Sequence, residues 1–201
     1  RAHQFHRTVR RSLHAGMLAS RPMNPAPNLV LVGPMGAGKT SIGKRLAVRL
    51  GLAFVDCDHR LEEVTGAPVP LIFECEGEAG FRARETALIA ELMRGRGQLI
   101  ATGGGAVLAE ANRKRLSERG YVVHLQVSVA QQIERLGRDR SRPLLAVGDK
   151  RAKLESMAIE RGPIYRDLAD LAFDADGLTV AIAAERLGAL LEQRWQRTEA
   201  A

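Results

Sequence analysis

A glycine-rich segment between an apolar run and a periodic stretch places the tightest limit on how this chain can fold. Residues 33–40, Gly-Pro-Met-Gly-Ala-Gly-Lys-Thr, match the pattern G-x-x-x-x-G-K-[ST] at every fixed position. The apolar residues 29–32 precede the segment, and an amphipathic pattern over about 39–50 follows it. A strand, a phosphate-binding loop and a helix in this order predict an α/β domain that binds a nucleotide.

The phosphate loop supplies a chemically specific set of candidate ligands. Its glycines allow backbone N–H groups to turn inward around phosphate oxygens, and the N-terminus of the following helix adds positive potential. We expect Lys39 to neutralise the β- and γ-phosphates of ATP, and the Thr40 hydroxyl to bind Mg²⁺. The predicted nucleotide-binding residues of this segment are Gly36, Ala37, Gly38, Lys39, Thr40 and Ser41.

Candidate strands and helices alternate along the rest of the chain, which predicts a parallel sheet covered by helices on both faces. Ligands of such sheets lie beyond the carboxyl ends of the strands, where the polar residues of interest stand in this sequence. Strands are predicted at about 29–33, 53–55, 98–102, 121–126 and 171–174. Helices are predicted over 39–50, much of 58–94 with breaks near Pro68, Pro70 and Gly77, from about 129, over 150–161 and over 178–195.

Two acids close the second predicted strand. Asp56 and Asp58 are two residues apart, so on a strand their side chains point to the same side. Such neighbours repel unless a cation or a proton lies between them, and a Mg²⁺–phosphate group supplies a cation. The strand over 98–102 ends in glycines rather than an acid, so the metal needs a carboxylate from elsewhere. We assign Thr40 and, through water, Asp56 to the metal, and Asp58 to the acceptor hydroxyl. The alternative is that one of the acids caps the next helix.

Further arginines and glycines suit an anionic ligand. Arg82 and Glu85 are three apart on a predicted helix and can pair, although this spacing also fits a surface ion pair. Residues 103–105 are all glycine and let the backbone approach a ligand, the alternative being a tight turn.

Residues 137–149 lack hydrophobic periodicity and are too long for an ordinary connection, which predicts a mobile functional loop. Guanidinium groups bind phosphates and carboxylates bidentately. Four of them, Arg135, Arg138, Arg140 and Arg142, lie in or just before this loop, and Arg161 follows it.

The net charge of +7 suggests nucleic-acid binding, but the distribution of charge argues against it. Residues 1–27 contain five arginines and no acid, so the other 174 residues carry 25 basic and 23 acidic groups. Aromatic residues, which stack on RNA bases, make up only 4% of the chain. We therefore expect no nucleic-acid partner.

The ends of the chain and its cysteines bear on domain limits and location. Residues 1–27 are expected to be a disordered basic leader or translated upstream sequence, with a targeting peptide as the alternative. A single domain is predicted over 28–196, with a tail at 197–201.

The sequence has no apolar run of about 18 residues, so we expect no membrane partner. Cys57 and Cys75 match neither a C-x-x-C pair nor a zinc site, which favours a reducing, cytoplasmic compartment.

Six motifs, taken in order, resemble those of the shikimate kinase family over about residues 28–195. They are G-P-M-G-A-G-K-T at 33–40, D-C-D at 56–58, G-F-R-A-R-E at 80–85, G-G-G at 103–105, R-P-L-L at 142–145 and R-G-P-I-Y at 161–165. The resemblance implies a three-layer αβα fold with a five-stranded parallel sheet of order 2-3-1-4-5. It also implies a mobile lid at about 137–149. We expect a monomer.

The resemblance also implies roles for individual residues. Lys39, Asp58 and Arg142 correspond to catalytic residues, with Asp58 at the acceptor hydroxyl and Arg142 reaching the phosphates of ATP from the lid. Arg135 corresponds to a residue near the adenine of ATP. The implied substrate-binding residues are Asp58, Arg82, Gly103, Gly104, Gly105 and Arg161, with the two arginines on the substrate carboxylate.

The implied reaction is transfer of the terminal phosphate of ATP to the 3-hydroxyl of shikimate, with Mg²⁺ as cofactor, in the biosynthesis of chorismate and the aromatic amino acids. Residue chemistry alone reaches only a kinase that acts on a small anionic acceptor. One alternative is another small-molecule kinase with a phosphate loop, such as one resembling gluconate kinase. The other alternative is a nucleotide-dependent binding module without enzymatic activity.

Overall fold

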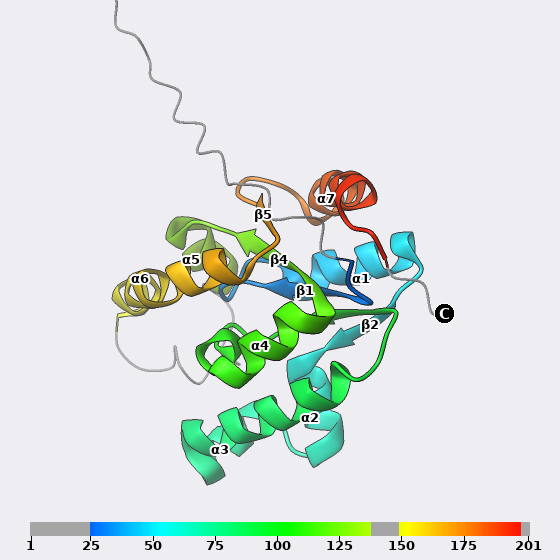
Figure 1. The fold of residues 1–201 in the computed structure, drawn as a ribbon. Helices are drawn as coiled ribbons and strands as arrows, with labels where there is room; N and C mark the ends of the chain where they lie inside the picture. Colours follow the sequence, from blue (N-terminus) through cyan, green and yellow to red (C-terminus); the bar gives the residue numbers. More distant parts are fainter. Residues whose placement is uncertain (1–24, 138–148, 198–201) are drawn as a thin grey trace, which may run out of the picture.

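The computed structural model describes residues 25–137 and 149–197. Helices enclose a five-stranded sheet, as predicted, in which the strands are all parallel and follow the order β2-β3-β1-β4-β5 (Figure 1). The strands are β1 (Asn28–Val32), β2 (Ala53–Asp56), β3 (Gln98–Ala101), β4 (Gly120–Gln126) and β5 (Leu171–Asp174). The helices are α1 (Lys39–Leu50), α2 (Cys57–Thr65), α3 (Val69–Leu92), the short 3₁₀ helix η1 (Ala106–Leu108), α4 (Glu110–Arg119), α5 (Val129–Leu136), α6 (Lys150–Leu168) and α7 (Val180–Arg194).

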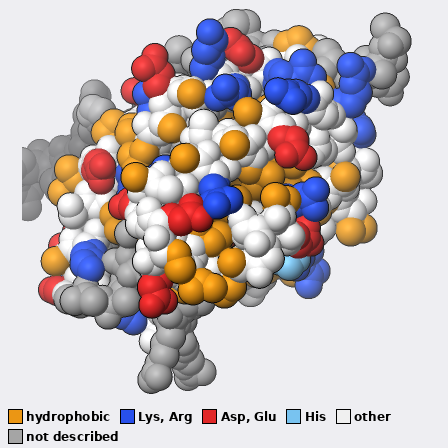
Figure 2. All heavy atoms as spheres, turned by 90° about the horizontal axis from the view of Figure 1, so that it is seen from below, with side chains coloured by type: hydrophobic (Ala, Val, Ile, Leu, Met, Phe, Trp, Pro, Cys, Tyr) orange, Lys and Arg blue, Asp and Glu red, His pale blue; other side chains and the backbone are white. Residues whose placement is uncertain are grey.

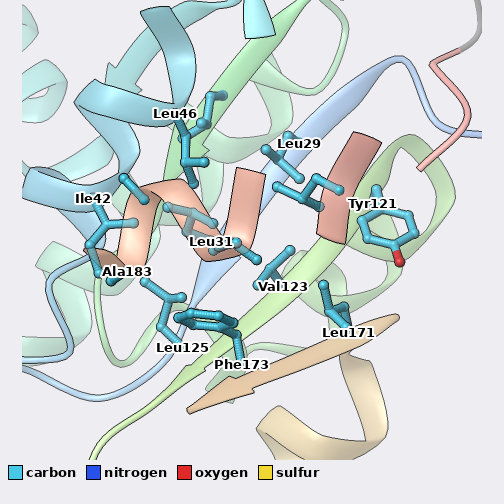
Figure 3. Close-up of a cluster of buried hydrophobic side chains, with 14 of the residues drawn as sticks. Leu29, Leu31, Ile42, Leu46, Tyr121, Val123, Leu125, Leu171, Phe173 and Ala183 are labelled. Atoms are coloured by element: carbon cyan, nitrogen blue, oxygen red, sulfur yellow. The ribbon is translucent and has the colours of Figure 1, made fainter. Parts of the chain in front are cut away.

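The sheet separates two hydrophobic clusters because its central strands are buried on both faces. Alternate residues of β1 point to opposite faces, so Leu29 and Leu31 join one cluster while Val30 and Val32 join the other. The first cluster packs α1 and α7 against the sheet, and Figure 3 shows their side chains meeting those of β1, β4 and β5. The second cluster packs α2, α3, α4 and α6 against the opposite face. This burial explains why the strands are continuous apolar runs rather than alternating ones.

Helix α1 occupies the predicted range and starts directly at the phosphate loop. Gly38 closes the loop with a φ of 89°, and Lys39 is the first helical residue. Gly51 ends the helix with a φ of 61°, and its N–H donates to the carbonyls of Ala47 and Val48. The positive N-terminal end of the α1 dipole therefore lies at the phosphate loop.

The boundary between β2 and α2 differs from the prediction. The strand ends at Asp56 and the helix begins at Cys57, so Asp58 lies in the first helical turn rather than on the strand. The inference that the two acids share one side of a strand was therefore wrong. Asp56 instead caps α2, because its carboxylate accepts hydrogen bonds from the backbone N–H groups of Asp58 and His59.

Two later helices also differ from the predicted boundaries. Pro70 does not break a helix, since it lies in the first turn of α3, where a missing N–H costs nothing. The predicted break at Gly77 is present as a kink, with φ 68° and ψ −177°. Helix α6 continues to Leu168, past the predicted end at 161 and through Pro163.

The two ends of the described chain meet beside β4. Ala26 and Arg197 form an isolated parallel bridge, and Nε1 of Trp195 donates to the Ala26 carbonyl at 3.1 Å. These contacts lie at the limits of the predicted domain over 28–196. The predicted leader lies almost wholly outside the described residues, and so does most of the predicted lid, including Arg138, Arg140 and Arg142.

The described residues also show how apolar the helices are and how charge is distributed on one face. Within residues 25–137 and 149–197, no helix combines the length and apolar character that crossing a bilayer requires. Figure 2 shows the face that is lowest in Figure 1, where basic and acidic side chains are interspersed.

Candidate active site

Two cavities meet beyond the carboxyl ends of β1, β2 and β3. We call the larger one, of about 780 Å³, the acceptor cavity, and the other, of about 410 Å³, the nucleotide cavity. Residues from three separate segments, each at or just after the carboxyl end of a strand, line both cavities, as the topology of a parallel sheet predicts. The shared residues are Met35, Thr40, Asp56, Asp58 and Gly104.

The nucleotide cavity is built mainly from the phosphate loop. Gly36, Gly38, Lys39, Thr40 and Ser41 line it, as predicted from the sequence, whereas Ala37 is fully buried beneath the loop. The Lys39 ammonium donates to the carbonyls of Gly33 at 2.7 Å and Pro34 at 2.9 Å, which holds it against the loop backbone.

Arg135 joins helix α5 to the phosphate loop and lines the nucleotide cavity. Its Nη1 donates to the Gly36 carbonyl at 2.9 Å, and its Nη2 donates to Oε1 of Gln131 at 2.6 Å and to the Ala175 carbonyl at 3.2 Å. The arginine therefore links its own helix to the phosphate loop and to the segment after β5, both of which line this cavity.

Asp56 and Thr40 bring oxygen atoms together where the two cavities meet. The Thr40 hydroxyl donates to Oδ2 of Asp56 at 2.6 Å, while Oδ1 of Asp56 caps α2. Asp56 is thus both the helix cap and the partner of the predicted metal ligand. No group of three or more His, Cys, Asp or Glu side chains within the described ranges is arranged to hold a metal ion. A hydroxyl and one carboxylate suit a hard cation such as Mg²⁺, which keeps several waters and also binds substrate phosphates.

The acceptor cavity contains the predicted anion-binding residues. Asp58, Arg82 and Arg161 all line it, although they come from α2, α3 and α6. Gly103, Gly104 and Gly105 line it from the segment after β3. Aromatic and aliphatic side chains complete the wall, among them Val69, Phe73 and Phe81. The fold therefore brings together all the predicted substrate-binding residues.

The predicted pair between Arg82 and Glu85 is confirmed, and it is not a surface pair. Nη1 of Arg82 lies 2.6 Å from Oε2 of Glu85, whose side chain is 2% exposed. Burial raises the pKa of the Glu85 carboxyl, while the nearby Arg82 guanidinium opposes that shift. The Arg161 charge opposes the rise in the Glu85 pKa more weakly, and Arg82, Glu85 and Arg161 all line the same cavity.

Four buried polar side-chain atoms lack hydrogen-bond partners in the part of the chain that the structure describes, and two of them belong to residues of the acceptor cavity. These two are Nε of Arg161, on a side chain that is 9% exposed, and Oε1 of Glu85. Buried donors rarely stay unpaired. An anionic ligand in the acceptor cavity would supply the acceptor that Nε of Arg161 needs.

The glycine run is needed because side chains approach its backbone closely. A Cβ on Gly103 would lie 2.5 Å from Oε1 of Glu85 and 3.2 Å from Oδ1 of Asp58. A Cβ on Gly105 would overlap the guanidinium group of Arg82. The run therefore does more than form a tight turn, because only glycine allows these functional side chains to stand against the backbone.

Sequence reasoning assigned no site role to Glu85, Tyr165 or His124. The signal for Glu85 was present in its spacing from Arg82, but spacing does not reveal burial. Tyr165 lies at the end of the R-G-P-I-Y motif, and its hydroxyl donates to the Gly104 carbonyl. His124 stacks on the Tyr165 ring, a contact between β4 and α6 that no local pattern predicts.

Comparison with known proteins agrees with this geometry. The family model SKI, described as shikimate kinase, matches residues 35–191. A shikimate kinase of Stenotrophomonas maltophilia (strain R551-3) is 53% identical over 177 residues, which cover 88% of this chain and 98% of the relative. A shikimate kinase of Xanthomonas oryzae pv. oryzae (strain PXO99A) is 49% identical over 178 residues, covering 89% of this chain and 99% of the relative.

Solved structures give the same result. A shikimate kinase from Acinetobacter baumannii in complex with shikimate has a TM-score of 0.79 and 44% identity, and the match covers 84% of this chain and 95% of that one. A shikimate kinase from Bacteroides thetaiotaomicron has a TM-score of 0.76 and 32% identity, covering 82% and 98%. The family match extends over most of the chain and includes both cavities, and the chain therefore belongs to the shikimate kinase family.

Proposed function

We propose that this protein transfers the γ-phosphate of ATP to the 3-hydroxyl of shikimate, which gives shikimate 3-phosphate and ADP. One observation carries the proposal: Arg82, Arg161 and Asp58 line a cavity that adjoins the phosphate loop. The cavity therefore offers cations for a carboxylate and an acid for a hydroxyl at the place where a γ-phosphate would arrive. The shikimate complex of the Acinetobacter baumannii enzyme, at 44% identity, supports this choice of acceptor.

The acceptor is held by charge at one end and by hydrogen bonds at the other. Arg82 and Arg161 bind the carboxylate, because a guanidinium group offers paired donors that match two carboxylate oxygens. Asp58 accepts a hydrogen bond from the reacting hydroxyl and aligns it with the phosphate. Backbone groups of residues 103–105 complete the hydroxyl site. Uncharged sugars are rejected because they would leave Nε of the buried Arg161 without an acceptor.

ATP lies along the phosphate loop in the nucleotide cavity. Backbone N–H groups of residues 36–41 surround its phosphates, and Lys39 turns from the Gly33 and Pro34 carbonyls to the transferring group. Arg135, which lines this cavity, would lie near the adenine of the bound ATP. Arg142, which is outside the described residues, adds positive charge at the phosphates. Positioning and charge stabilisation supply most of the catalysis in phosphoryl transfer.

Mg²⁺ fits the oxygen atoms of Thr40 and Asp56. Thr40 would hold the ion directly through its hydroxyl, and Asp56 would hold it through a water molecule, while its other oxygen continues to cap α2. When bound, Mg²⁺ neutralises charge on the phosphate oxygens. We further propose that the enzyme acts as a monomer in the cytoplasm, in the biosynthesis of the aromatic amino acids.

The test is a coupled assay of ADP release with shikimate, gluconate and nucleoside monophosphates as acceptors, each at saturating MgATP. Shikimate is expected to support turnover about 100-fold faster per unit concentration than the others, because an acceptor whose hydroxyl is displaced by about 1 Å from the γ-phosphate loses about that much in rate. Faster turnover with gluconate would favour a gluconate kinase-like enzyme. ATP binding without turnover on any acceptor would favour a binding module.

A further inference from the structure

Tyr165 connects helix α6 to the glycine run at residues 103–105. It lies four residues after Arg161 on α6, is 3% exposed, and donates its hydroxyl proton to the carbonyl oxygen of Gly104. Burial raises the pKa of Tyr165 to about 12, and the positive charge of Arg161, one helical turn earlier, opposes that shift. The hydroxyl thus joins α6, the helix that carries Arg161, to the backbone of the glycine run.

Gly104 is the point at which this link reaches the phosphate loop. It lines both cavities. A Cβ on Gly104 would lie 3.5 Å from the backbone nitrogen of Met35 and 3.6 Å from the carbonyl oxygen of Gly33, which is ordinary contact distance. A displacement of Gly104 would therefore change the spacing between the acceptor and the phosphate loop.

His124 holds the tyrosine ring from the side of the sheet. The two ring centroids are 5.0 Å apart, with an interplanar angle of 27°. On β4, His124 pairs in register with Val32, the last strand residue before the phosphate loop. The stack therefore ties the ring of Tyr165 to β4, the neighbour of the strand that carries this loop.

We infer that Tyr165 is a positioning residue, whose hydroxyl fixes Gly104 relative to α6 and its Arg161, beside the phosphate loop, and so sets the line of transfer between donor and acceptor. The inference rests on the proposed function. Its physical basis is that phosphoryl transfer depends on alignment, so a displacement of about 1 Å lowers the rate about 100-fold. Tyr165 itself touches neither the phosphate nor the reacting hydroxyl in this account.

The test is the full-length Tyr165→Phe variant, which removes one oxygen atom and keeps the ring stacked on His124. We expect kcat/KM for shikimate to fall about 10–100-fold, while KM for MgATP changes less than about 2-fold. A misaligned acceptor would let water take the phosphate more often. The ratio of ADP released to shikimate 3-phosphate formed is therefore expected to be higher in the variant than in the parent enzyme. A purely structural role would lower the use of both substrates together and would not change that ratio.

Tyr121→Phe is the matched control. Tyr121 is equally buried, at 4% exposed, but it packs in the cluster on the other face of the sheet, near Trp195. It should keep parent kinetics and the parent ADP ratio. Parent kinetics in Tyr165→Phe, or equal losses for both substrates, would overturn the positioning role. A parent enzyme that does not phosphorylate shikimate would instead refute the proposed function, so the two failures are distinguishable.

Discussion

Arg82 and Glu85 form a buried ion pair one helical turn apart on α3. Their closest atoms are 2.6 Å apart, and Glu85 is almost completely removed from solvent. Breaking such a pair is costly because it leaves one buried charge unpaired. Glu85 therefore holds Arg82 against the glycine run, in the orientation that the acceptor cavity requires.

The Arg82→Ala variant tests the role of this guanidinium. We expect kcat/KM for shikimate to fall about 10–100-fold, from the loss of a charged hydrogen bond of about 1.5–3 kcal/mol, while KM for MgATP stays close to the parent value. Steady-state kinetics with each substrate varied in turn measures both effects. Arg84→Ala is the control, because Arg84 lies on the same helix but pairs with Glu76 at the surface. A collapse of ATP binding with intact shikimate dependence would show that Arg82 has another role.

The Asp56→Asn variant separates metal binding from helix capping. Asparagine caps helices about as well as aspartate, so the free energy of unfolding should change by less than about 1 kcal/mol. Loss of the negative charge should raise the free Mg²⁺ concentration needed for half-maximal activity by about 10-fold. Activity is measured against free Mg²⁺ at constant ATP. An unchanged Mg²⁺ requirement, together with lowered stability, would reduce Asp56 to a helix cap.

The Gly103→Ala variant tests the close approach at the glycine run. The added methyl group meets Oε1 of Glu85 at 2.5 Å, so we expect a loss of about 1–3 kcal/mol in the free energy of unfolding and a higher KM for shikimate. Urea denaturation and steady-state kinetics measure the two effects. Gly162→Ala, in α6, provides the comparison because a Cβ there meets nothing within 4 Å. Equal stability in the two variants would contradict the packing described here.

The His124→Phe variant tests a buried neutral imidazole. Burial, with Lys39 and Arg166 nearby, lowers the pKa of His124 from 6.5 to about 4. The folded state binds this proton less tightly than the unfolded chain, so the stability contribution is present above pH 6.5 and is lost as the pH falls toward 4. The loss is at most about 3 kcal/mol, and it should be absent from the variant.

Urea denaturation of parent and variant between pH 7 and pH 4 measures this difference. The parent curve should fall more steeply than the His124→Phe curve. His59→Gln, at an exposed histidine, should give a curve parallel to the parent. Parallel curves for the parent and His124→Phe would mean that this imidazole does not resist protonation in the folded state.

The sequence was most informative where the candidate functional residues are consecutive in the chain. The phosphate loop occupies residues 33–40, and its flanking strand and helix were predicted closely because both are strongly patterned. The D-C-D segment was read wrongly because it crosses a boundary between strand and helix, where a period of two no longer applies. Asp56 could therefore be proposed as a site residue from the sequence, but the relative direction of the Asp56 and Asp58 side chains was predicted wrongly.

Contacts between distant segments could not be predicted from patterns. Arg82 and Arg161 are far apart in sequence, and only the family resemblance placed them together. The contact of Tyr165 with Gly104 spans 61 residues and depends on how α6 packs on the segment after β3. The burial of Glu85 likewise depends on the whole fold, because an i, i+3 spacing is the same on the surface and in the core.

The most direct test of the account compares shikimate with its methyl ester, which has the same hydroxyls but no negative charge. We expect kcat/KM of the parent enzyme to be about 100-fold or more higher for shikimate than for the methyl ester. In the Arg161→Ala variant this ratio should fall to about 10-fold or less. Equal use of acid and ester by the parent would contradict the claim that paired arginines beside the phosphate loop select the substrate.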